Sequence, residues 1–342
     1  RPEDVSCNEP AKAISCSNSQ DIVGWVQIAN CPATFRRASG GVIGNYCYLF
    51  GDQYTNASRE LNINYQTWSS IAPGAPVGNC NYDGVSTGNA IYLVGGYTSG
   101  APAPYHNNMQ KFTPIGGGPN GVWNQMTPYP LSVCGVAAAY DGINHIYVAG
   151  GGNASGDTPL ANIYDVSNNS WSGLPPLPTP MKYHGGAWVN GKFHVVGGYN
   201  TGNAHYAFDP STNMWLIMPP VPTAVYFSTF CTTSSMGRYL IIIGGGGGYL
   251  SWPATNAVQI FDAVTGVWLT PETPLPMTLG TNFGKYIGGG CCISAGGYDG
   301  VNNYWDAFWG WSFPGMVLAV DLEVNPVTPP IVIPSAGGSF NY

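Results

Sequence analysis

Residues 192–215 read KFHVVGGYNTGNAHYAFDPSTNMW. An apolar run ends there in a glycine pair, and the apolar Phe208 is then followed by Asp209 and, seven positions after Phe208, by Trp215. β-branched and aromatic residues favour strands, and the polar PSTN between Asp209 and Trp215 is typical of a tight turn. The stretch therefore predicts a strand that ends at glycines, followed by a β-hairpin whose returning strand begins near Trp215.

The same pattern recurs along the chain. Apolar runs end in glycine pairs that begin at Gly95, Gly150, Gly197, Gly244 and Gly296, and a degenerate copy has Gly51 followed by Asp52. The returning strands carry Trp68, Trp123, Trp171, Trp215 and Trp268, with an insertion, GGGPNG, before Trp123. Six copies at intervals of 44 to 55 residues indicate repeated β-sheets.

The two ends of the chain lack complementary parts of the repeat. Val320 and Asp321 occupy the apolar-Asp position of the sixth copy, but Val327 stands where Trp is expected. Trp25 resembles a Trp strand without a preceding strand of its own. Because an open sheet edge is a liability, we predict that the strand at Trp25 completes the last sheet and closes a ring.

The glycine pair and the aromatic–Trp spacing resemble the kelch repeat over residues 23–325, which is nearly the whole chain. The resemblance implies an all-β fold, a six-bladed kelch-type β-propeller with four-stranded antiparallel blades, closed by the N-terminal strand. Residues 1–22 are then an N-terminal extension, which we expect to be held by a disulfide through Cys31. Residues 326–342 form a tail with the apolar run PPIVIP, which either lies across its own propeller, links to a further domain or pairs as a strand with a neighbouring subunit.

Charge excludes some partners. The chain has ten Lys and Arg against seventeen Asp and Glu, a net charge of −7, and only 8% charged residues. No basic cluster is present that would neutralise a run of phosphates, so the sequence argues against nucleic acid and against an anionic membrane surface. No apolar run approaches the length of a membrane-spanning helix, so we expect no membrane insertion.

Cysteines and glycosylation motifs predict an extracellular location. Nine cysteines form no CxxC pair, and three Asn-x-Ser/Thr motifs begin at Asn56, Asn153 and Asn168. Buried free thiols are the alternative interpretation of the cysteines. Together with the few lysines, these features favour an oxidising compartment with disulfides and glycans.

Enzymes of the copper radical oxidase family, related to galactose oxidase, are built on a kelch-like propeller. The resemblance to their site implies two histidines, a tyrosine ligand and a tyrosine cross-linked to cysteine. The chain offers adjacent Tyr-His pairs at Tyr105 and Tyr183, but we expect most of its histidines to be structural; they are His106, His145, His184, His194 and His205. No counterpart of the accessory domain that supplies a copper ligand is evident, so we expect no metal, no cofactor and no catalytic residues.

The sixth glycine pair is followed by YDGVNNYWDAFWGWSF, residues 298–313, which we interpret as an aromatic loop. Corresponding loops after the fifth and second glycine pairs contain aromatics as well, including Tyr97 and Tyr105. Such side chains pack on their own blade, contact another subunit or stack on sugar rings. The candidates for a binding surface or interface are Tyr249, Trp252, Tyr298, Tyr304, Trp305, Phe308, Trp309 and Trp311.

Taken together, the sequence predicts a secreted, non-catalytic propeller that acts as a structural or adhesive building block. We expect its partners to be copies of itself, assembled through the loops and the C-terminal strand into a filament. A carbohydrate-binding propeller that recognises neutral glycans is the alternative, and a copper radical oxidase is a third hypothesis.

Overall fold

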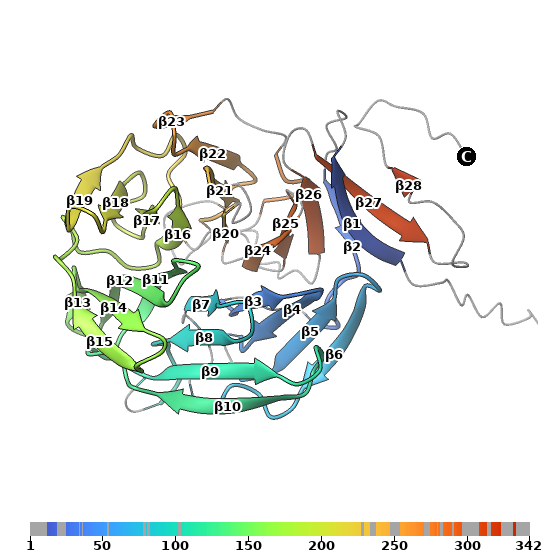
Figure 1. Ribbon diagram of the computed structural model, residues 1–342, viewed down its shortest axis with the longest axis horizontal. Helices are drawn as coiled ribbons and strands as arrows, with labels where there is room; N and C mark the ends of the chain where they lie inside the picture. Colours follow the sequence, from blue (N-terminus) through green and yellow to red (C-terminus); the bar gives the residue numbers. More distant parts are fainter. Residues whose placement is uncertain are drawn as a thin grey trace, which may run out of the picture.

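Strand pairing in the computed structural model follows the repeat (Figure 1). Blade 1 contains β3 (Ser39–Ile43), β4 (Tyr46–Phe50), β5 (Ser58–Asn62) and β6 (Thr67–Ile71). Blade 2 contains β7 (Asp83–Ser86), β8 (Ile91–Val94), β9 (Met109–Pro114) and β10 (Gly121–Met126). Blade 3 contains β11 (Cys134–Tyr140), β12 (His145–Asn153), the short β13 (Gly156–Asp157), β14 (Ala161–Asp165) and β15 (Ser170–Gly173). Blade 4 contains β16 (Gly185–Val189), β17 (Lys192–Val196), β18 (His205–Asp209) and β19 (Met214–Ile217). Blade 5 contains β20 (Thr229–Thr232), β21 (Tyr239–Ile243), β22 (Val258–Asp262) and β23 (Val267–Trp268).

The structure describes residues 12–18, 25–33, 35, 37–52, 55–77, 80, 83–101, 104–226, 229–232, 237–246, 254–269, 274–278, 280, 283–288, 291–295, 308–312, 316–322 and 331–332. Within each of the five blades all neighbouring strands are antiparallel, and the order in the sheet follows the order in the chain. The result is an all-β propeller with four-stranded antiparallel blades, and the predicted fold class is confirmed at that level.

The last part of the predicted architecture needs correction. β24 (Phe283–Gly288), β25 (Cys291–Ala295) and β26 (Phe308–Ser312) form a sheet whose fourth strand is β2 (Val26–Ile28), next to Trp25. The strand that contains Val320, β27 (Met316–Leu322), is not part of it. The structure therefore contains five blades, not six, whose strands follow one another along the chain. The predicted pairing between the Trp25 strand and the Val320 strand was wrong.

Spacing explains the error. In blades 2 to 5 the third strand begins 8 to 14 residues after the first glycine of the pair, and β26 begins 12 residues after Gly296. β27 begins 20 residues after Gly296 and is too late. The sequence FWGWS of β26 also has the aromatic content that favours a strand.

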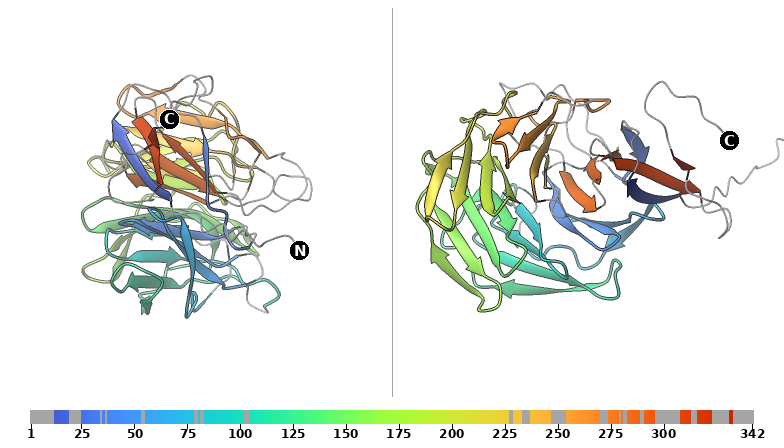
Figure 2. Two further views of the ribbon diagram at one scale, coloured as in Figure 1. Left: turned by 90° about the vertical axis from the view of Figure 1, so that its right-hand side faces the viewer. Right: turned by 45° about the horizontal axis from the view of Figure 1, so that its top comes forward.

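β27 belongs to a separate sheet at one edge of the molecule (Figures 1 and 2). It pairs on one side with β1 (Lys12–Asn18) and on the other with β28 (Ile331–Val332). β28 is the middle of the predicted C-terminal apolar run, and in the structure it pairs within its own chain, where Val320 lies opposite Ile331.

The glycine pairs are explained by backbone conformation. Gly197 and Gly198 have φ values of 79° and 113°, in the left-handed region that side chains with a Cβ rarely adopt, and the pair at Gly95 is alike. The N–H of Gly198 donates to the carbonyl of Val225, just before the first strand of the next blade. The pairs at Gly95 and Gly197 thus follow the second strands of blades 2 and 4 and connect them to the next blade, whereas in blade 3 the second strand continues through Gly150 and Gly151 to Asn153.

Side-chain hydrogen bonds of Asp explain why the hairpins of different blades share one register. The Oδ1 of Asp209 accepts a hydrogen bond of 2.9 Å from the N–H of Ser211 and so fixes the turn. Asp262 holds the turn of blade 5 likewise, through the N–H of Val264 at 3.0 Å. Asp after the apolar residue therefore forms the turn in these blades, whereas blades 1 and 2 have Asn62 and Thr113 at this position.

Tryptophans join neighbouring sheets at the outer rim. The indole N–H of Trp215 donates to the carbonyl of Pro175, which follows the outer strand of the preceding blade, at 2.8 Å. The equivalent bonds of the other returning strands join Trp123 to Pro73, Trp171 to Thr127 and Trp268 to Pro219. In blade 1 the acceptor for Trp68 is Ala29, directly after β2, so β2 holds the place of an outer strand that precedes blade 1.

Hydrophobic cores lie between adjacent blades. Alternate residues of β8 face opposite neighbours: Leu93 packs with the aromatic residues Tyr48 and Phe50 of blade 1, and Tyr92 packs with Val148 and other residues of blade 3. This period of two is the ordinary alternation of a strand buried on both faces. Trp25 packs against the core of blade 5.

Candidate functional site

The end of the propeller where the second strands stop at glycines carries a group of tyrosines, which we call the tyrosine cluster. Its members are Tyr97, Tyr105, Tyr183, Tyr199 and Tyr226. Two of them follow glycine pairs, and two precede the first strands of blades 4 and 5. The rings of Tyr97 and Tyr105 meet edge to face at 5.4 Å between centroids, and those of Tyr199 and Tyr226 at 5.7 Å. These geometries are the favourable ones for aromatic pairs.

Lys182 supplies a cation to the tyrosine cluster. Its Nζ lies 2.7 Å from the Oδ1 of Asp157, which comes from the hairpin of blade 3. The same Nζ lies 5.6 Å from the ring centroid of Tyr199, in blade 4, and 5.9 Å from that of Tyr183. A cation at this distance over an aromatic face is attracted to it. Lys182 therefore links blades 3 and 4. Polar and aromatic groups surround its ammonium at this end of the propeller.

Cys134 lies under the tyrosine cluster. Its Sγ is 3.5 Å from the hydroxyl of Tyr183, and burial raises the pKa of the thiol and of the phenol. A thiol in this setting stays protonated at neutral pH, which is the opposite of an activated nucleophile. Gly135 is required next to it, because a Cβ there would lie 2.4 Å from the ring of Tyr183. The pair is a packed structural contact.

The five histidines lie at four separate places in the propeller, and each has a hydrogen-bond partner. His106 Nε2 lies 2.7 Å from Thr98 Oγ1, and His184 Nε2 lies 3.0 Å from the carbonyl of Ala149. His145 contacts Asp141, and His194 contacts His205. Within the described ranges, no three His, Cys, Asp or Glu side chains gather in a geometry that would hold a metal ion.

The eight predicted aromatic candidates fall into two groups. Tyr249, Trp252, Tyr298, Tyr304 and Trp305 lie outside the described residues. Phe308, Trp309 and Trp311 lie in β26, which pairs with β25 on one side and with β2 on the other. The prediction of a loop over residues 298–313 was therefore wrong for residues 308–312, which form a strand inside a sheet.

The glycosylation candidates lie at loops and turns. Asn56 is exposed ahead of β5, and Asn168 is exposed in the turn between β14 and β15, where its amide donates to Asp165 at 2.8 Å. Asn153, at the end of β12, is half-buried and donates to the carbonyl of Ser132 at 3.1 Å. The cysteines Cys31, Cys47, Cys80 and Cys134 are buried, and no disulfide is found within the described part of the chain.

One surface escaped the sequence analysis. β19, the outer strand of blade 4, exposes Met214, Leu216 and Ile217 to 59%, 37% and 82%. Among the described residues it pairs only with β18, along one of its two backbone edges. We call β19 with these side chains the apolar edge. An alignment of the Trp strands carries the signal, because Trp215 is followed by Leu and Ile where Trp68 is followed by two serines.

No helix in the described part of the chain has the length and apolar character needed to cross a membrane.

Comparisons with known proteins agree with this architecture. No family model matches the sequence. The chain is 24% identical over 204 residues to Kelch repeat and BTB domain-containing protein 12 of Homo sapiens, covering 51% of this chain and 32% of that protein. It is 26% identical over 234 residues to Kelch-like protein 23 of Homo sapiens, covering 53% and 40%. It is 24% identical over 266 residues to Kelch-like protein 25 of Xenopus tropicalis, covering 73% and 43%.

The chain thus spans between 32% and 43% of the length of these curated relatives. Among solved structures, that of YjhT superimposes with a TM-score of 0.67 at 15% identity, covering 88% of this chain and 99% of the other. At this identity the likeness concerns the fold alone.

Proposed function

Since the chain is a kelch-repeat β-propeller, we propose that it is a non-catalytic interaction unit that assembles with copies of itself as a structural building block. The apolar edge is the observation that carries the proposal. An exposed strand edge with three apolar side chains is a surface that proteins normally protect with charge or cover with a partner.

A second copy is the occupant that the chemistry favours. β19 contains no charged residue, and the chain as a whole has only 8% charged residues. A partner that presents an uncharged β-edge can therefore pair with β19 without burying an unpaired charge. The C-terminal apolar run, which includes β28, and the aromatic loops remain candidates for the opposite side of this contact.

We further propose that the sheet of β24, β25, β26 and β2 serves as the closing blade. Two observations support this. β24 contacts both β20 and β3, the inner strands of blades 5 and 1. The Trp68 indole bonds to Ala29 after β2, as the other indoles bond to the residues after β6, β10, β15 and β19.

Secretion and glycosylation are also part of the proposal. Asn56 and Asn168 are exposed and accessible to a transferase, which supports a glycoprotein in an extracellular compartment. Mass spectrometry of the protein from its native source, before and after glycan removal, tests this, with a mass loss expected at these two positions.

Assembly is tested by sedimentation velocity and electron microscopy over a wide range of protein concentration. We expect wild type to form oligomers or filaments, and the double variant Leu216→Ser and Ile217→Ser to remain single particles with unchanged circular dichroism. Ile143→Ser is the matched control, because Ile143 is 81% exposed in blade 3, far along the chain from β19. Single wild-type particles at all concentrations, or equal loss of assembly in the control, would contradict the proposal.

A neutral-glycan-binding propeller is the second candidate function, and the tyrosine cluster favours it. Flat aromatic faces beside polar groups such as Lys182 and Asn200 suit the stacking of sugar rings. A glycan array with wild type and Tyr199→Ala tests it, with binding to neutral glycans expected for wild type and lost in the variant. If no glycan binds wild type, this candidate fails and the assembly proposal is unaffected.

A further inference from the structure

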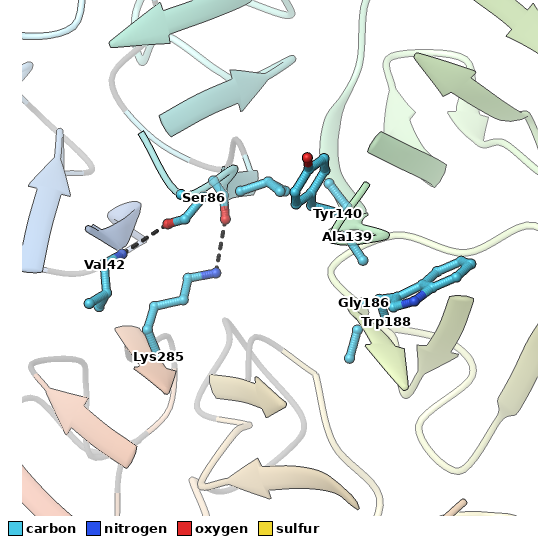
Figure 3. Close-up of a pocket in the computed structure, with 13 residues that line it drawn as sticks. Val42, Ser86, Ala139, Tyr140, Gly186, Trp188 and Lys285 are labelled. Carbon is cyan, nitrogen blue, oxygen red and sulfur yellow. Dashed lines mark hydrogen bonds between the residues drawn. The ribbon is translucent and has the colours of Figure 1, made fainter. Parts of the chain in front are cut away.

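A pocket opens at the end of the propeller opposite the tyrosine cluster (Figure 3). It lies where the first strands of blades 1 to 4 end, and β24 contributes Lys285. Its volume is about 380 Å³, within the range of small-molecule sites. Neither the repeat pattern nor the aromatic loops pointed to this place.

Small residues on the inner strands make the pocket. A Cβ at Gly84 would lie 2.4 Å from the carbonyl oxygen of Gly40 on the neighbouring blade, and a Cβ at Gly186 would lie 2.9 Å from the Cβ of Ala137. Close packing of the inner strands therefore demands glycine and alanine there. Because these residues have little or no side chain, the space in front of them stays open.

Lys285 contributes the cation of the pocket. Its Nζ donates to the carbonyl of Gly84 at 2.9 Å, and no ion pair to it is found among the described residues. An ammonium group has three N–H donors, and the carbonyl of Gly84 is the one hydrogen-bond acceptor found for them among the described residues. Figure 3 shows this side chain reaching from β24 toward the strands of blades 1 and 2.

A carboxylate behind the strands helps to keep this cation in place. Asp83 is half-buried, and its two oxygens accept hydrogen bonds of 2.8 Å from the N–H groups of Gly84 and Ala138. Burial raises the pKa of Asp83, and attraction to Lys285 acts in the opposite direction. The two backbone amides fix the position of Asp83, and its attraction to Lys285 helps to keep the ammonium group beside Gly84.

The other polar groups of the pocket point to an acceptor-rich ligand. The Oγ of Ser86 accepts from the N–H of Val42 at 2.9 Å, so its own hydrogen is free to be donated. The hydroxyl of Tyr140 donates to the carbonyl of Ile143. No Asp or Glu is among the described residues that line the pocket.

Trp188 stands at the edge of the pocket. Its ring stacks on Tyr147 with centroids 4.9 Å apart and packs against the core between blades 3 and 4, so the indole extends away from Lys285 (Figure 3).

We propose that this pocket binds a monosaccharide-sized sugar acid, with the carboxylate of the ligand on Lys285 and a hydroxyl of the ligand on Ser86. The cation, the Ser86 hydroxyl, the volume of the pocket and the absence of a carboxylate among its described lining residues carry the proposal together. A charge-assisted hydrogen bond to the ammonium distinguishes a sugar acid from the matching neutral sugar. The proposal is independent of assembly through the apolar edge.

The experiment is calorimetric titration of the whole chain with galacturonate and with galactose. We expect galacturonate to bind at least about tenfold more tightly than galactose, since a hydrogen bond to a charged group contributes about 1.5–3 kcal/mol. Raising the salt concentration should weaken galacturonate binding. Equal affinity for the two sugars, or no binding of galacturonate, would overturn the proposal without any variant.

Variants then locate the site. Lys285→Met keeps the aliphatic stem and should lose the preference for galacturonate, whereas Lys285→Arg should retain most of it. Lys182→Met, at the opposite end of the molecule, is the matched control and should bind as wild type does. Should Lys285→Met fail to fold, Ser86→Ala provides the second variant and should weaken both sugars. Wild-type affinity in folded Lys285→Met would refute the site.

Discussion

Blades 3 and 4 have the same outer strand in every respect but one. β15 and β19 each contain four residues with the same sequence of exposed and half-buried positions, and both donate a Trp N–H to the preceding connector, at 2.9 and 2.8 Å. Beside its Trp, β15 exposes Ser170, Ser172 and Gly173, whereas β19 exposes Met214, Leu216 and Ile217. The shared hydrogen bond indicates that the fold requires the Trp, whereas the other three positions differ between the two blades. The proposed contact between copies is our explanation for their apolar character in blade 4.

The interiors of the same two blades differ as well. In blade 4, His194 Nδ1 lies 2.9 Å from His205 Nε2, and His205 Nδ1 lies 3.2 Å from the carbonyl of Pro219. Blade 3 has Tyr147 and Ala161 at the equivalent positions. Burial lowers the pKa of His194 to about 3 and that of His205 to about 4.

The largest expected effect is a loss of stability in acid, caused by the buried histidines of blade 4. An unfolded histidine has a pKa of about 6.5, so between that pH and the folded pKa the unfolded chain binds the extra proton and stability falls as pH falls. We expect a loss of about 1.4 kcal/mol per pH unit for each buried histidine, or about 2 kcal/mol each at pH 5. Guanidinium unfolding at pH 7.5 and pH 5 measures it.

The variant His194→Gln isolates this contribution. Glu60 acts in the opposite direction, because burial raises its pKa to about 7 and its protonation favours the folded state below that pH. The difference in pH dependence between wild type and His194→Gln cancels Glu60. If the two proteins lose the same stability between pH 7.5 and pH 5, His194 is not a buried neutral group.

The next effect tests whether the two outer strands really share one role. Trp171→Ala and Trp215→Ala should each cost about 3 kcal/mol, because each removes a large half-buried ring and leaves the carbonyl of the preceding connector without its donor. Denaturant unfolding measures both. Trp171→Phe and Trp215→Phe, which remove only the N–H, should cost about 1 kcal/mol. A clear inequality between the blades would show that the apolar edge also stabilises the single chain.

The smallest expected effect on stability comes from placing the apolar residues of β19 on β15. Transfer of the apolar pair to blade 3, as Ser172→Leu with Gly173→Ile, should change the free energy of unfolding by less than about 0.5 kcal/mol, because these positions are exposed. Its effect on association should be clear. We expect larger or branched assemblies by sedimentation velocity, and an unchanged distribution would argue that exposed apolar side chains on an outer strand are not sufficient for contact.

Sequence predicted the five contiguous blades because each repeat element answers a local requirement. The glycine pair at Gly197 and Gly198 is needed because the backbone is left-handed there, and Asp209 is needed because its side chain fixes the turn. Trp215 marks a bond to the connector before its own blade. Local requirements leave local signals, so the number and order of these strands follow from one pass along the chain.

The last sheet could not be assigned in this way, because two strands compete for one place. β26 and β27 both follow the sixth glycine pair, and both have strand composition. Pairing with β2, from the other end of the chain, decides between them. The pocket escaped for a similar reason: Gly84, Trp188 and Lys285 come from three separate repeats, and nothing in the sequence near any one of them indicates the other two.

The pairing of Val26 with Gly310 has a consequence for biosynthesis. β2 is made among the first strands, but its partner leaves the ribosome only after all five contiguous blades have been translated. Until then, β2 lacks its partner β26 and the first blade lacks the sheet whose β24 contacts β3, so this flank stays accessible to chaperones or to other nascent chains. A long-range contact of this kind is slow to form, so we expect completion of the molecule to be a late, post-translational step.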